Sequence, residues 1–141
     1  MSAPLTLQDF PIRTFDKVRY ADTDRQGHVN NAHFSEYFET GRVELLYHPE
    51  HPLHADDATF VIASYRVDYR KEIKWPGIVD IGTAVTRIGT SSIRVYQGLF
   101  QAGQLVATSE SIIVHVSQSE STPLLAVTRH QLERYLKEIP E

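Results

Sequence analysis

The sequence contains no cysteine. Thiolate nucleophiles, disulfide bonds and zinc–thiolate sites are therefore excluded, and a cytosolic location is compatible with this absence. The chain also lacks any apolar run near the roughly 20 residues that a membrane-spanning helix needs. Its first residues, MSAPLTLQDFPIR, contain no apolar core of signal-peptide length. We therefore expect a soluble, cytoplasmic protein without a membrane partner.

Clustered positive charge is missing as well. The net charge is −4 and no block of like charges occurs, whereas a protein that binds nucleic-acid backbones needs a basic patch. Walker-type and Rossmann glycine patterns are absent, and GTSS at 89–92 is not the nucleophile elbow of a serine hydrolase. We therefore expect no nucleic-acid partner, and any anionic ligand would have to be held by a local group of cations.

The 141 residues fit one domain, and 41% of them are apolar. One long helix is predicted at 30–48, because Phe34, Phe38, Gly41 and Leu45 fall on one helical face. Asn30 is its expected N-cap. Gly41 is unfavourable in mid-helix, and we expect a close approach of the helix to a sheet to compensate.

The rest of the chain is mainly strand-like. A first strand begins at Thr14 within 14–23, and a short amphipathic helix is predicted at 127–139. Between the long helix and this short one, four strands are predicted, with a polar loop, SESTP, after the last. They cover 58–73, 78–88, 92–101 and 105–118. This order predicts the α+β class, with an antiparallel sheet wrapped around the long helix.

The joint between the first strand and the long helix reads ADTDRQGHVNN at 21–31. A helix start exposes unpaired N–H groups and carries partial positive charge, so it can hold an oxyanion. Asp24 lies in the loop that feeds this helix, and its ionised form would serve as a nucleophile or general base. The pair suits acyl transfer, although aspartates and asparagines in such loops often only cap helices or form turns.

The segment RYADTDRQGHVNNAHFSEYFETGR at 19–42 resembles the signature of the hotdog-fold thioesterases of the 4-hydroxybenzoyl-CoA thioesterase-like family. The resemblance implies a single hotdog domain over residues 1–141 and hydrolysis of an acyl thioester without a cofactor or metal. It implies that Asp24 is the catalytic carboxylate and that the backbone N–H of Asn31 polarises the thioester carbonyl. Asp22 is expected to hold the loop in shape.

The GHVNN form resembles the acyl-ACP thioesterases more closely than the acyl-CoA enzymes, many of which have an aromatic residue at the position of Asn30. The acyl-ACP enzymes use a D-x-N-x-H motif, in which His28 matches and Gln26 replaces the asparagine. Their Y-R-R-E motif resembles YRKE at 69–72, which points to Glu72. Phe34 stands where a tyrosine is usual. The carrier, CoA or ACP, therefore stays open.

His28 is expected to polarise the substrate, to orient Asp24, or to bond only within the loop. Gly27, Asn30 and Glu72 are expected to contact the substrate, although Glu72 lies among basic residues and would also suit a surface ion pair. Arg70 and Lys71 are candidates for the CoA phosphates. His48, His51 and His54 invite a metal interpretation, but two prolines make their segment irregular and we expect no metal there.

Two further functions remain open. One is a hotdog enoyl-thioester hydratase or dehydratase, whose aspartate and histidine are usually spaced by five, whereas Asp24 and His28 are four apart. The other is a non-catalytic acyl-CoA-binding module. The resemblance also implies a homodimer or homotetramer, because the long strand at 58–73 would otherwise present unpaired backbone groups.

Overall fold

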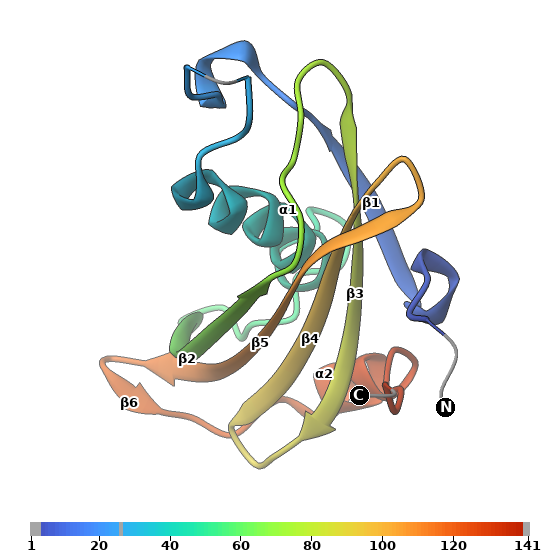
Figure 1. The fold of residues 1–141 in the computed structure, drawn as a ribbon. Helices are drawn as coiled ribbons and strands as arrows, with labels where there is room; N and C mark the ends of the chain where they lie inside the picture. Colours follow the sequence, from blue (N-terminus) through green and yellow to red (C-terminus); the bar gives the residue numbers. More distant parts are fainter. Residues whose placement is uncertain (1–3, 26, 140–141) are drawn as a thin grey trace.

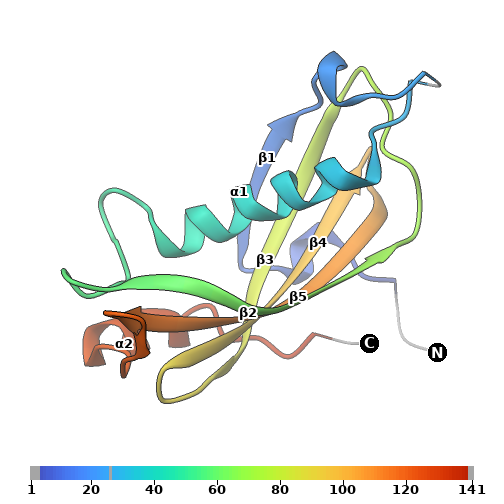
Figure 2. The ribbon, with the colours of Figure 1, turned by 90° about the vertical axis from the view of Figure 1, so that its left-hand side faces the viewer.

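The computed structural model describes residues 4–25 and 27–139. Within them an antiparallel sheet has the strand order β1-β3-β4-β5-β2, and a short β6 pairs with β5. The strands are β1 (Ile12–Lys17), β2 (Thr59–Tyr69), β3 (Ile78–Ile88), β4 (Ser92–Gln101), β5 (Gln104–Ser117) and β6 (Glu120–Ser121). The helices are α1 (Phe34–Leu46) and α2 (Ala126–Glu133). The sheet curves around α1, which crosses its concave side, and α2 lies near the far end (Figures 1 and 2). No helix among the described residues is long and apolar enough to cross a membrane.

Helix α1 forms the core with the concave face of the sheet. Its buried residues include Phe34 and Phe38, which pack in one cluster with the inward-facing Ile81 and Leu99, and Leu45, which packs in a second cluster. Gly41 faces the sheet so closely that an added Cβ would lie 2.6 Å from Thr83 Oγ1. The predicted compensation for a glycine in mid-helix is therefore confirmed.

The predicted fold class is confirmed: one helix, a wrapping antiparallel sheet and a short C-terminal helix. The predicted bounds of β3 and β4 agree with the structure. β2 and β5 are also present where they were predicted, but they begin and end at different residues from those predicted. The predicted helix at 30–48 begins as a 3₁₀ turn, Asn31–His33, that continues into α1, and the side chain of Asn30 caps the turn by accepting from Ala32 N–H at 2.9 Å.

Three predicted boundaries are wrong. The first strand starts at Ile12 and ends at Lys17, and a 3₁₀ turn follows at Tyr20–Asp22, because the chain must turn into the loop there. The predicted helix at 127–139 stops at Glu133, since Lys137 N–H instead bonds to Val85 O at 2.8 Å beside the bulge in β3. The polar loop after β5 contains β6.

Candidate active site

The loop between β1 and α1 is a tight, backbone-bonded unit at the top of Figure 1. Thr23 and Val29 form an antiparallel bridge, and Asn30 N–H donates to Asp22 O at 3.0 Å. Gly27 has a φ of +78°, a left-handed conformation that glycine adopts without strain. The glycine of the motif is therefore required by the turn itself.

Asp22 holds this loop in shape, as predicted. Its carboxylate is buried and accepts two hydrogen bonds from the Arg19 guanidinium, at 2.7 and 3.1 Å. The hydrogen bond and the charge of Asp22 raise the pKa of Arg19. Because this acid is already paired and enclosed, Asp22 is poorly placed to reach a substrate.

Asp24 occupies the outer side of the same loop, and its side chain is exposed. Its N–H donates to His28 O at 2.8 Å, and His28 N–H donates to Asp24 Oδ1 at 3.3 Å. The carboxylate therefore has a defined orientation at the solvent-facing side of the loop. Gln26, which replaces the motif's asparagine, lies outside the described residues.

The start of the helical segment follows directly. Helix-start N–H groups lack intrahelical acceptors, and the Asn30 side chain takes only that of Ala32. Within 4–25 and 27–139 no protein acceptor is found for the Asn31 N–H. The backbone N–H named by the motif is therefore available at the positive end of the helix dipole.

His28 meets Glu72 across 44 residues of sequence. His28 Nδ1 lies 3.1 Å from Glu72 Oε2. Backbone contacts support this meeting, because His28 pairs with Lys74 in a bridge and Val29 N–H donates to Ile73 O at 2.8 Å. Glu72 therefore lies within ion-pair distance of the motif histidine rather than of a neighbouring strand cation.

A tyrosine hydroxyl also reaches this region, from a residue that the sequence did not single out. Tyr69 on β2 donates to Asn31 O at 3.4 Å, and its ring packs edge-on against Phe34 with centroids 5.1 Å apart. The resemblance predicted a tyrosine at the position of Phe34, and the structure instead has a hydroxyl from β2 beside the helix start. Tyr69 is the first residue of YRKE at 69–72, and this motif was the feature of the sequence that could have pointed to it.

One group among the described side chains has the spacing of metal ligands. Ligand atoms of Asp22, His33 and Glu36 lie within 4.8 Å of one another. The Arg19 guanidinium lies against the two carboxylates, 2.7 Å from Asp22 and 3.7 Å from Glu36. A cation therefore already occupies this position, and a metal ion would have to displace it.

The histidine-rich segment after α1 lies at the opposite end of the helix from the loop. The 13 residues of α1 separate the two, about 20 Å at 1.5 Å per residue. His48 and His51 stack at 5.8 Å and line a separate hollow of about 250 Å³. His54 contacts Ala55 O instead. The three histidines do not converge on one point.

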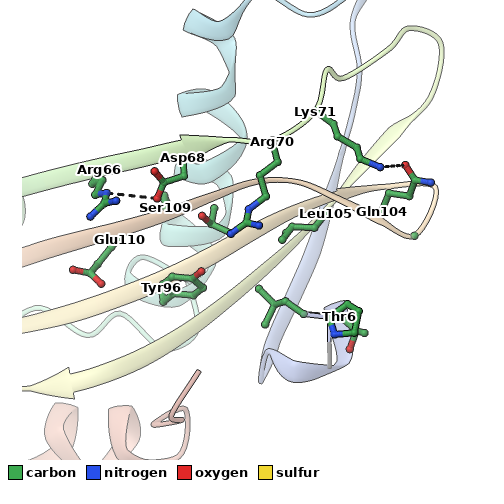
Figure 3. Close-up of a pocket in the computed structure, with 14 residues that line it drawn as sticks. Thr6, Arg66, Asp68, Arg70, Lys71, Tyr96, Gln104, Leu105, Ser109 and Glu110 are labelled. Carbon is green, nitrogen blue, oxygen red and sulfur yellow. Dashed lines mark hydrogen bonds and ion pairs between the residues drawn. The ribbon is translucent and has the colours of Figure 1, made fainter. Parts of the chain in front are cut away.

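Arg70 and Lys71 lie on a groove of about 1080 Å³ on the outer face of the sheet (Figure 3). Arg66 contacts Asp68 at 3.5 Å, whereas the Lys71 ammonium donates to the neutral Gln104 at 2.9 Å. A second hollow of about 820 Å³ shares Lys71 and Gln104 with this groove and extends to Glu72. The excess positive charge therefore lies at the end of the groove nearest Glu72.

Comparisons with known proteins identify the family of the chain. The family model of the thioesterase-like superfamily matches residues 18–133. The acyl-CoA thioester hydrolase YbgC of Escherichia coli O6:H1 is 27% identical over 122 residues, covering 84% of this chain and 88% of that protein.

Solved structures show the same similarity. A thioesterase from Thermus thermophilus, solved with coenzyme A and zinc, superposes with a TM-score of 0.79 at 28% identity, over 89% of this chain and 94% of that one. A protein of Pseudomonas aeruginosa strain PAO1 superposes with a TM-score of 0.82 at 23% identity, over 96% and 98% of the two chains, which shows the shared fold.

Proposed function

The chain belongs to the thioesterase-like superfamily and is an enzyme with thioesterase activity, and from this premise we propose that it hydrolyses acyl-CoA with Asp24 as its catalytic carboxylate. One observation carries the assignment of residues: a single hydrogen-bonded loop holds the Asp24 carboxylate and leads directly into the helix start at Asn31. A carboxylate and an oxyanion donor on one short loop can act on the same carbonyl carbon. The acyl-CoA substrate is supported by the activity named for YbgC.

In this mechanism the Asp24 carboxylate takes a proton from water as the water oxygen attacks the thioester carbon. The Asn31 N–H donates to the carbonyl oxygen as it becomes negative. The C–S bond then breaks, the proton passes to the leaving thiolate, and free acid and thiol depart. Direct attack by Asp24 would instead give an acyl-aspartyl anhydride that water cleaves. Both routes need the ionised carboxylate.

His28 and Glu72 have a positioning role in this proposal. His28 N–H donates to Asp24 Oδ1, and its ring lies against Glu72. With its backbone bonded to Asp24 and its ring against Glu72, His28 would keep the loop, and with it the carboxylate, in a fixed orientation toward the substrate. Gly27 and Asn30 contribute through the turn and the cap rather than through chemistry.

Replacing Asp24 with asparagine tests the assignment. The new side-chain amide would keep an oxygen that accepts from His28 N–H, so the loop should keep its shape, but an amide is a poor base and nucleophile. We expect kcat to fall at least 10²-fold, measured as thiol release from a panel of acyl-CoAs, with an unchanged circular dichroism spectrum. Asp56→Asn, at an exposed aspartate in another loop, is the matched control. Turnover of Asp24→Asn within a few-fold of wild type would remove Asp24 from the mechanism.

The charge of the outer groove supports CoA as the carrier. We propose that Arg70 and Lys71 bind its phosphates, since these cations lie beside the hollow that extends to Glu72. Arg70→Gln should raise KM for acyl-CoA about tenfold or more and leave KM for the matching acyl-pantetheine, which has no nucleotide, unchanged. Arg87→Gln, at an exposed arginine on β3 outside the groove, is the control. Equal effects on both substrates would place the phosphates elsewhere.

Homodimer formation belongs to the same proposal. β2 ends the strand order, so one edge of this 11-residue strand has no partner among the described strands. A long unpaired edge is a template for pairing with another chain. Antiparallel pairing of β2 with β2 of a second copy would continue the sheet across a two-fold axis, and pairing of two such dimers would give a tetramer.

A further inference from the structure

Arg42 is a buried cation for which the described residues offer no carboxylate. It is 8% exposed, and its contacts are Gln97 Oε1, at 3.5 Å, and the ring of Tyr65, whose centroid lies 5.4 Å from the guanidinium carbon. Gln97 is neutral, and its amide N–H groups donate to Phe38 O and Thr83 Oγ1. Removing a guanidinium from water without a counter-charge is costly, so this arrangement indicates a missing anionic partner.

The position of Arg42 shows from which side that partner comes. Thr40 bonds to Asp16 on β1, so the Thr40 flank of α1 faces β1, and Arg42, two residues further on, lies on the opposite flank, towards β2. Tyr65 and Ile62 lie on the helix-facing side of β2, yet they are 37% and 48% exposed. The seam between α1 and β2, which lie beside each other in Figure 2, is therefore partly exposed. Arg42 lies on the α1 side of this seam, because its guanidinium contacts the Tyr65 ring.

An acidic residue occupies the same flank of the helix. Glu39 precedes Arg42 by three residues, which places the two on neighbouring rows of one helical face. Glu39 is exposed, and no cation lies within ion-pair distance of it among the described residues. The flank thus carries one positive and one negative group that have no oppositely charged partner among the described residues, an arrangement that can complement itself across a two-fold axis.

The strand geometry brings these groups to such an axis. The midpoint of β2 (Thr59–Tyr69) is Ser64, so a full-length antiparallel pairing with a second copy would centre the axis there. Tyr65, next to that midpoint, contacts both Phe38 and Arg42. The stretch of α1 that contains Glu39 and Arg42 therefore lies over the axis, where the α1 helices of the two copies would face each other.

Building on the homodimer proposed above, in which β2 pairs with β2, we propose that Arg42 of each copy forms an ion pair with Glu39 of the other across the α1–β2 seam. The two ion pairs would be related by symmetry and shielded by the apolar seam, which strengthens them relative to surface pairs. They would also fix the register of β2 against β2, because a shift along the strand would separate both pairs.

Charge exchange tests the pairing through the dimer dissociation constant, measured by light scattering and sedimentation. Glu39→Arg should raise this constant at least tenfold, because each Arg42 then faces another arginine. Glu44→Arg is the matched control, since Glu44 is exposed on the same helix but away from the seam, and it should leave the constant unchanged. Glu39→Arg combined with Arg42→Glu in one chain should restore the wild-type constant.

Arg42 is buried, so Arg42→Glu can fail to fold by itself. In that case Glu39→Arg combined with Arg42→Gln, which removes the repulsion, should dimerise at least tenfold more tightly than Glu39→Arg alone. Equal dimer dissociation constants for Glu39→Arg and Glu44→Arg would overturn the ion pair. The ion pair would also be overturned if the double variants fold but dimerise no more tightly than Glu39→Arg. Neither result would contradict the dimer through β2. A monomeric wild type would overturn both, and thioester hydrolysis, assayed separately, decides the catalytic proposal.

Discussion

Replacing Gly41 with alanine sets two opposite effects against each other. Helix propensity alone favours alanine by about 1 kcal/mol. The new Cβ, however, would lie 2.5 Å from Gln97 Nε2, 2.6 Å from Thr83 Oγ1 and 2.8 Å from Ile81 Cγ2. Overpacking of this kind costs roughly 1–3 kcal/mol.

Two of the atoms that the new Cβ would clash with, on Gln97 and Thr83, are hydrogen-bonded to each other. Gln97 Nε2 donates to Thr83 Oγ1 at 3.0 Å and to Phe38 O at 2.9 Å. Displacing this buried amide would lose one or both bonds, at about 1–3 kcal/mol for each group left unsatisfied. With one bond lost and the propensity gain subtracted, we expect Gly41→Ala to lower the free energy of unfolding by about 1–5 kcal/mol, or the melting temperature by roughly 3–20 °C.

Urea denaturation followed by far-ultraviolet circular dichroism measures this change. Tryptophan fluorescence is less suitable, because the single tryptophan, Trp75, is partly exposed in the loop before β3. Glu44→Ala, on an exposed part of α1, is the control for propensity without a clash. A Gly41→Ala protein as stable as wild type, or more stable, would show that the close approach of α1 to the sheet does not decide the residue at this position.

Two further outcomes are expected. His28→Ala should lower kcat about 10- to 10²-fold, which is less than the effect of Asp24→Asn. Adding Glu72→Gln to His28→Ala should lower kcat little further, because residues that act as a unit are not additive. Steady-state kinetics of the wild type, the two single variants and the double variant checks this, and fully additive effects in the double variant would contradict it. Burial raises the pKa of Tyr37 to about 12. Between about pH 10 and pH 12 the hydroxyl is therefore ionised in the unfolded chain but still protonated in the folded protein. The free energy of unfolding should fall by roughly 2 kcal/mol as the pH rises across that window. Tyr37→Phe should lose this part of the alkaline transition at little cost at neutral pH, since the buried hydroxyl has no hydrogen-bond partner among the described residues; an unchanged alkaline transition in urea-melt series would contradict the assignment.

The parts of the fold that the sequence predicted well are those set by local pattern. Strands β3 and β4 have strong β-formers and sharp turns at both ends, so their bounds agree with the structure. The end of β1 was misjudged because Val18 and Tyr20 are good β-formers, while the chain turns there to bring Asp22 to Arg19. The early end of α2 reflects a bond to β3, which is a long-range contact that helical periodicity cannot predict.

The candidate site divides in the same way. The loop motif itself named Asp24, His28 and Asn31, because it is contiguous in sequence. The contact of His28 with Glu72 and the approach of the Tyr69 hydroxyl to Asn31 depend on where β2 ends relative to α1. YRKE pointed to Glu72 only through resemblance, and Arg42 gave no signal, because a lone arginine in an amphipathic helix usually faces solvent.

The polarity of ADTDRQGHVNN follows from two separate requirements at one joint. A loop that reverses direction between a strand and a helix has backbone groups that regular structure does not satisfy. Part of the motif meets this need: Asp22 O accepts from Asn30 N–H, Asn30 Oδ1 accepts from Ala32 N–H, and Gly27 adopts the left-handed turn. The same loop holds the Asp24 carboxylate, which accepts from His28 N–H, and continues directly into the helix start at Asn31. In the proposed mechanism Asn30 and Gly27 would therefore be a condition for the chemistry, since without them the Asp24 carboxylate and the Asn31 N–H would have no fixed relation to each other.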